Sequence, residues 1–211
     1  IDNEYLYQSQ AFIVGEEKIA IAIKTSTTTW TNQNITVTIT YPSVTTSSTR
    51  KAGYGTTLAN AQTATTSAIA PTTSVTVTAN GYVYATATDT AGNVITASKQ
   101  ITNIDKVLPV IKEITEENIT TKSFDIKVKG QDNESGLSEI RIYKNEELMV
   151  SYPYTERLNE EKEETYSLTG LEENTTYKIK VELIDKVGNI NVSEEKEITT
   201  LKRVIVSRII G

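Results

Sequence analysis

One pattern occurs twice in this chain and limits its fold more than any other feature. From Tyr177 to Leu183 apolar and polar residues alternate, a period of two that predicts a β-strand buried on one face only. An Asp-x-x-Gly-Asn turn follows at Asp185. A weaker copy runs from Tyr82 into the same turn at Asp89, which lies 96 residues before Asp185. That spacing is about the length of one β-sandwich of roughly 100 residues, so the repeat predicts two sandwiches in tandem.

The remaining composition supports this all-β prediction and places the boundaries. The chain of 211 residues is rich in Thr, Val, Ile and Tyr, which favour strands. We expect a Thr-rich domain over residues 25–105 and a more acidic domain over residues 106–201. Pro109 favours an extended chain at the start of the second domain. A connection this short predicts that the two domains form an end-to-end rod.

The two ends of the chain do not fit the repeat. Residues 1–24 contain two short β-prone runs that could form a hairpin, or the second run could be the last strand of a preceding module. Residues 202–211 form a β-prone tail with three positive charges and no acid. The tail could be the first strand of a following module, or it could add to the sheet of a neighbouring subunit. Its candidate assembly residues are Val204, Ile205, Val206, Ile209 and Ile210.

Several function classes are disfavoured by what the sequence lacks. There is no cysteine, and therefore no disulfide or thiolate metal site. There is no histidine, the commonest general base at neutral pH, so catalysis would depend on carboxylates, Ser/Thr, Lys or Tyr, and we predict that the chain is not an enzyme. The net charge of −6 argues against a nucleic-acid partner. No apolar run approaches the roughly 20 residues that span a membrane as a helix.

Local patterns give further expectations for each domain. Residues 44–70, rich in Thr, Ser, Ala and Gly, predict meandering loops and short edge strands. Trp30 is expected in the core beside the strand at residues 35–41. The charged run at residues 156–164 predicts a solvated loop or short helix, and residues 192–198 predict the last strand.

The first domain has an unusually neutral surface. Between Thr25 and Ser98 the only charged residues are Arg50, Lys51 and Asp89. A lone soluble domain normally carries mixed charge. Such a surface is either solvated by its hydroxyl groups, with or without attached glycans, or packed against copies of itself or other chains.

Candidate binding residues are aromatic or acidic. The aromatic residues that could contact a ligand from end loops are Tyr54, Tyr82, Tyr84, Tyr152 and Tyr154. For calcium we considered Asp89, Asp105, Asp185 and a separate acidic loop at residues 132–134. No Asp-x-Asp-x-Asp loop is present, and bonds from Asp side chains to the backbone of their turns explain these residues, so we predict no metal and no cofactor.

These residues resemble a known family. Residues 29–40, the turn at 89–93 and residues 102–106 resemble the tandem immunoglobulin-like repeats of Gram-positive surface and secreted proteins. Residues 170–189 resemble the closing half of a fibronectin type III-like module, including a tyrosine corner at Tyr177, whose place in the first module is taken by Gly81. The resemblance covers residues 25–201. It implies tandem β-sandwiches used as stalks, adhesins, enzyme spacers or phage tail decorations, with no shared catalytic residues.

The leading hypothesis is therefore a non-enzymatic structural segment of an extracellular bacterial surface filament, stalk or adhesin. Its partners would be neighbouring modules or copies of itself, and a surface glycan or host protein is a further candidate. The alternative is a glycan- or protein-binding accessory module of a secreted enzyme, or of a phage tail or fibre protein. The expected location is the cell surface, or the virion surface for a phage-derived chain.

Overall fold

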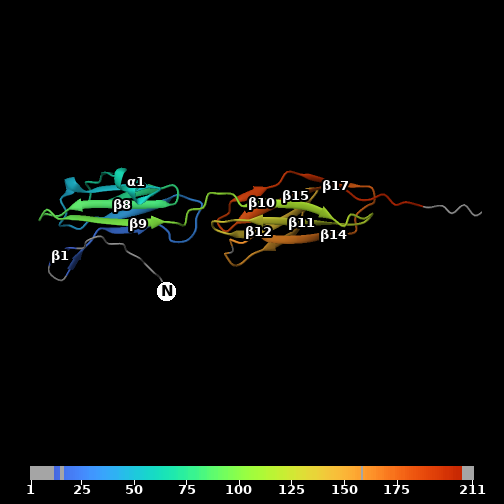
Figure 1. Ribbon diagram of the computed structural model, residues 1–211, viewed down its shortest axis with the longest axis horizontal. Helices are drawn as coiled ribbons and strands as arrows, with labels where there is room; N and C mark the ends of the chain where they lie inside the picture. Colours follow the sequence, from blue (N-terminus) through green and yellow to red (C-terminus); the bar gives the residue numbers. More distant parts are fainter. Residues whose placement is uncertain (1–11, 15–16, 158, 206–211) are drawn as a thin grey trace, which may run out of the picture. The chain divides into compact units, whose positions relative to one another are not determined.

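The computed structural model describes residues 12–14, 17–157 and 159–205. The chain divides into two compact units, Ile1–Asp105 and Lys106–Gly211 (Figure 1). Among the described residues, no helix is long and apolar enough to cross a membrane.

The first unit contains two antiparallel sheets. One has the strand order β3 (Ala22–Thr25), β4 (Ile35–Thr40), β7 (Thr72–Val77), and the other has the order β6 (Thr66–Ser67), β5 (Lys51–Gly55), β8 (Gly81–Thr88), β9 (Val94–Ile101). A short hairpin of β1 (Phe12–Val14) and β2 (Glu17–Ile19) precedes them. A 3₁₀ helix η1 (Ser47–Thr49) and a helix α1 (Leu58–Thr63) complete the unit.

The second unit repeats this arrangement. One sheet has the order β10 (Val110–Glu117), β11 (Phe124–Gln131), β14 (Lys162–Leu168). The other has β13 (Glu147–Pro153), β12 (Leu137–Lys144), β15 (Thr176–Asp185), with β16 (Ile190–Val192) and β17 (Lys196–Thr199) both pairing with β15. Strands in corresponding places therefore pair in the same order in both units. The predicted all-β class with tandem immunoglobulin-like or fibronectin type III-like sandwiches is confirmed.

Alternating burial builds the core of each unit. On β4, Ile35, Val37 and Ile39 are fully buried, and the threonines between them lie on the other face of the sheet. On β15 the buried residues are again every second one, from Tyr177 to Asp185. Each buried aliphatic side chain stabilises the fold by about 1.5–3 kcal/mol. The period of two thus decides which face of each strand becomes the core.

The tyrosine corner predicted in the second unit is present. The Tyr177 hydroxyl oxygen accepts a hydrogen bond from the backbone N–H of Glu172, with 2.8 Å between the atoms. The Tyr177 ring packs at 6.1 Å from the ring of Phe124 in the core. In the first unit, where Gly81 takes this place, Asn80 holds the chain instead, because its side chain donates to Ile104 O and accepts from Ile104 N, both at 2.9 Å.

Helix α1 corrects the prediction of loops and edge strands alone over residues 44–70. Thr57 caps the helix by accepting a bond from Asn60 N at 3.2 Å. Ala61 is fully buried, and the helix lies against two glycines of β5. A Cβ atom at Gly53 would lie 2.6 Å from Ala61 O, and one at Gly55 would lie 2.5 Å from Ala61 N. The glycines flanking Tyr54 therefore make room for a helix, which single-sequence periodicity does not reveal in six residues.

Four smaller expectations also differ from the structure. Strand β3 belongs to the first sheet, although the sequence analysis assigned residues 1–24 to a separate segment. Trp30 is half-buried and lies outside the hydrophobic core cluster of its unit. Strand β14 begins within the charged run expected to be a loop, because Glu163 and Glu164 pair with Lys129 and Val128 of β11. The last strand is interrupted, so residues 190–199 form β16 and β17 instead of one strand.

The close packing of α1 on β5 predicts the effect of adding one methyl group. We expect Gly53→Ala to destabilise the first unit by about 1–3 kcal/mol, because the new Cβ would meet backbone atoms that cannot move independently. Urea denaturation measures this change.

The control is Gly92→Ala in the same unit, where an added Cβ has no neighbour within 4 Å and only the positive φ of 91° opposes it. We expect it to cost about 1 kcal/mol. Equal effects of the two variants would contradict the proposed packing.

Candidate functional site

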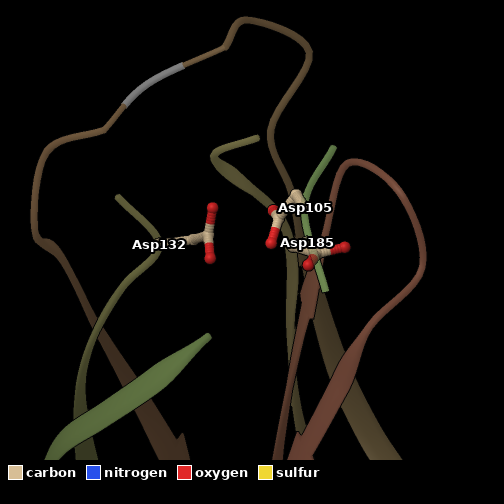
Figure 2. A group of neighbouring side chains, drawn as sticks. All are labelled: Asp105, Asp132 and Asp185. Carbon is tan, nitrogen blue, oxygen red and sulfur yellow. The ribbon is translucent and has the colours of Figure 1, made fainter. Parts of the chain in front are cut away.

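Three buried aspartates form the most concentrated acidic group among the described residues. Asp105, Asp132 and Asp185 each place a carboxylate oxygen within 4.8 Å of the others. Their exposed fractions are 0%, 2% and 2%. Figure 2 shows Asp132 pointing towards Asp105 and Asp185. The sequence analysis had placed Asp132 in a separate acidic loop, and the structure corrects this.

Asp132 and Asp185 lie at strand ends, and Asp105 follows the isolated bridge between Thr31 and Ile104. Asp132 follows β11, and its Oδ1 accepts bonds from Glu134 N at 3.1 Å and Gly136 N at 2.6 Å. Asp105 is the residue immediately before Lys106, where the second unit begins. Its backbone N–H donates to Thr31 O at 2.9 Å.

Asp185 is the last residue of β15 and organises the turn that follows. Its Oδ1 accepts bonds from Val187 N at 2.9 Å and Asn189 N at 2.8 Å, and its Oδ2 accepts from Asn189 Nδ2 at 2.6 Å. Gly188, with φ of 89°, allows the chain to turn back. The sequence predicts this turn, but no pattern in it indicates a neighbouring acid.

The corresponding turn of the first unit, at Asp89, forms without an acidic group beside it among the described residues. Asp89 Oδ1 accepts bonds from Ala91 N and Asn93 N, both at 2.8 Å, and its Oδ2 accepts from Asn93 Nδ2 at 2.9 Å. The side-chain bond from Asn93 lowers the pKa of Asp89. Asp89 does not belong to a group of three or more potential metal ligands among the described residues. The turn bonds are therefore the same in both units, and the neighbouring carboxylates are what differ.

This geometry suits a hard cation better than a reaction. Negative charges buried close together repel each other strongly unless a cation or protons neutralise them. Ca²⁺ takes six to eight oxygen ligands, often carboxylates and backbone carbonyls. The three aspartates could supply three of these oxygens.

A calcium titration tests whether the three aspartates bind Ca²⁺. A cation held by this group would neutralise the repulsion, so we expect millimolar Ca²⁺ to raise the melting temperature above its value in EDTA. Each kcal/mol of stabilisation should raise it by about 4 °C. Differential scanning calorimetry at neutral pH provides the measurement.

Two matched variants control for the turn. Asp185→Asn and Asp89→Asn alter equivalent turns with equivalent backbone bonds. Only Asp185→Asn should abolish the calcium response. A response that survives in Asp185→Asn, or that is lost equally in Asp89→Asn, would contradict calcium binding by the three aspartates.

The candidate aromatic residues do not form one platform. Tyr54, Tyr82 and Tyr84 lie in the first unit, and Tyr152 and Tyr154 lie in the second. Three of them make hydrogen bonds within their own unit through their hydroxyl groups: Tyr54 donates to Ala79 O at 2.6 Å, Tyr152 donates to Thr165 O at 3.1 Å, and Tyr154 donates to Glu164 Oε1 at 2.8 Å. Burial, followed by the bond to Glu164, raises the pKa of Tyr154, so its hydroxyl stays protonated at neutral pH.

Tyr82 and Tyr84 are arranged differently. They occupy alternate positions of β8, whose other alternate residues are buried, and both are half-buried. They therefore lie on the outward face of their sheet. Their partners on β5 are Gly55 and Gly53, the two glycines on which α1 packs. These are the two candidate aromatic residues that the fold brings together on one outer face.

The tail is only partly described. Val204 and Ile205 are 82% and 84% exposed and lie in no strand. Val206, Ile209 and Ile210 lie outside the described residues.

Comparisons with known proteins give a fold-level likeness. No family model matches the sequence, and no curated protein matches it either. Among solved structures, the chain is similar to the FN1–FN3 domains of chicken CNTN1, with 14% identity and a TM-score of 0.36. The match covers 86% of this chain and 66% of that chain.

The fold is therefore assigned from the strand order within each unit and not from this similarity. Both units are antiparallel sandwiches of a three-stranded sheet and a second, larger sheet, with corresponding strands in the same order. The protein is thus a tandem β-sandwich protein of the immunoglobulin-like or fibronectin type III-like class. That class includes structural and adhesion modules.

Proposed function

We propose that this chain is a non-enzymatic structural segment of an extracellular bacterial surface filament, stalk or adhesin, and that its tail takes part in assembly. The observation that carries the proposal is the way in which both units fasten the residues that connect them. In the first unit, Asn80 makes two bonds with Ile104. In the second unit, Asn189 Nδ2 donates to Val107 O at 3.2 Å and Asn191 Nδ2 donates to Pro109 O at 2.8 Å.

These bonds restrict the chain at the end of the first unit and at the start of the second. Without them the backbone torsions of these residues would be freer. Ends that are held in this way favour a stalk or filament over a flexible tether.

The tail supports assembly in particular. An exposed run of β-branched residues is an aggregation hazard unless it pairs with another strand. Val204 and Ile205 are the most exposed large hydrophobic residues in the described chain. Strand addition to a neighbouring subunit would bury them.

The alternative is a binding module of a secreted enzyme or of a phage tail or fibre protein. The outward pair Tyr82 and Tyr84 favours it, because aromatic rings on a sheet face can stack on sugars or peptides. Retention of the protein on a glycan array, lost in the double variant Tyr82→Ala/Tyr84→Ala, would support this alternative.

Light scattering after size exclusion tests the structural proposal. We expect the full chain to elute as concentration-dependent oligomers, and a chain ending at Leu201 to elute as a monomer. The shorter chain keeps every described strand, because β17 ends at Thr199. It also keeps the bond from Leu201 N to Thr120 O, so loss of assembly would not reflect loss of folding.

Circular dichroism of both chains provides the control for folding. A monomeric full chain at all concentrations would contradict assembly through the tail.

A further inference from the structure

We infer that strand β7 of the first unit is the acceptor edge that pairs with residues 204–210 of a second copy of this chain. This inference rests on the proposed assembly through the tail. It also identifies the strand that accepts the tail, and this assignment can be wrong even if the chain assembles through its tail.

Strand β7 is an unprotected sheet edge. It lies at the end of its sheet, and among the described residues it pairs with β4 alone. Its sequence, Thr-Thr-Ser-Val-Thr-Val, has no charge and no proline, and its register with β4 is continuous over six residues. Natural proteins usually block such edges with charges, prolines, bulges or very short strands. None of these devices is present in β7.

The other described edge strands all carry at least one such device. Charges mark β3 (Lys24), β9 (Lys99), β14 (Lys162, Glu163, Glu164) and β17 (Lys196, Glu197). Strand β10 has Lys112, Glu113, Glu116, Glu117 and a register shift, and β13 has Glu147 and Pro153. Strands β1, β2, β6 and β16 have three residues or fewer.

The acidic edges of the second unit are also less available to a basic tail than their sequence suggests. Lys129 lies 2.8 Å from Glu113 and 3.5 Å from Glu163, and Lys127 lies 2.8 Å from Glu163. These cross-strand ion pairs neutralise part of the charge on β10 and β14. An incoming strand would have to displace or desolvate them, whereas β7 presents hydroxyl groups and backbone only.

The register identifies the backbone groups that β7 offers. Tyr41 N donates to Pro71 O at 2.8 Å, which fixes the alternation of hydrogen-bonded pairs along β4 and β7. By this alternation Thr73, Val75 and Val77 bond to β4, and Thr72, Ser74 and Thr76 direct their N–H and C=O groups outward. The bond from Ser26 N to Thr36 O, at 2.8 Å on the opposite side of β4, agrees with this assignment. A new strand would thus find three donors and three acceptors.

Apolar side chains in β7 and shortly before it are partly exposed. Val75 is only partly buried although it packs against the core of the unit. Ile69, which precedes the strand, is 66% exposed. Inward-facing Val or Ile side chains on an added strand would extend the core over this side of the sheet.

The tail matches this edge in length and chemistry. Residues 204–210 read Val-Ile-Val-Ser-Arg-Ile-Ile, with a single charge. At about 3.3 Å per residue, seven residues span about 23 Å and the six residues of β7 span about 20 Å. The tail follows the last described strand, so pairing would not require any strand of the donor to leave its sheet.

Substitution of Ser74 in the full chain tests the acceptor. Ser74→Pro removes an outward N–H and spares the bonds between β7 and β4, whereas Ser74→Ala keeps the N–H and serves as the matched control. In light scattering we expect Ser74→Pro to need at least 10-fold more protein for the same degree of assembly. Ser74→Ala should assemble like the unchanged chain. Equal assembly of all three proteins would overturn β7 as the acceptor and leave the proposed function standing.

Hydrogen exchange gives a second measurement that does not depend on the folding of a variant. The synthetic peptide 202–211 is added to the chain ending at Leu201, and amide exchange is followed residue by residue. We expect the amides of Thr72, Ser74 and Thr76 to slow at least 10-fold. Protection of another edge strand, or of none, would overturn the inference. A full chain that is monomeric throughout would instead contradict the proposed function itself.

Discussion

The structure depends on one constraint, which is that every second residue of a strand must enter a core that has no room for water. In the first unit, Ile35, Val37 and Ile39 on β4 are fully buried. In the second unit, Val181 and Leu183 on β15 are fully buried as well. A shift of one residue in any of these strands would turn threonine, lysine or glutamate inward. The register of both sandwiches, and with it the position of each turn and edge, follows from this alternation.

Alternating burial does not protect the edges of the sheets, and the two units differ in how their edges are protected. The second unit protects its long edges with charges that pair across strands, such as Lys129 with Glu113 and Glu163. Between Thr25 and Ser98 the first unit has only three charged residues, and its edge β7 has no charge at all. A neutral edge remains soluble only if hydroxyl groups hydrate it or another strand covers it. This difference between two units with the same strand order is the basis for assigning the acceptor of the tail to β7.

The buried aspartates Asp89 and Asp185 form the same kind of turn in the two units. Asp89 and Asp185 accept equivalent bonds within equivalent turns. Asp132 and Asp105 bring two further carboxylates near Asp185. Three neighbouring carboxylates repel one another, and a bound cation would offset that repulsion and give the turn a second task.

The class of fold, the tandem repeat, the turns at Asp89 and Asp185 and the corner bond of Tyr177 could be predicted from the sequence, because these depend on period and local turn chemistry. Features that depend on residues distant in the sequence required the tertiary structure. Helix α1 packs on Gly53, and its six residues are too few for the helix to be recognised from sequence periodicity. Asp132 meets Asp105 and Asp185 because strand order, and not spacing in the chain, brings turns together.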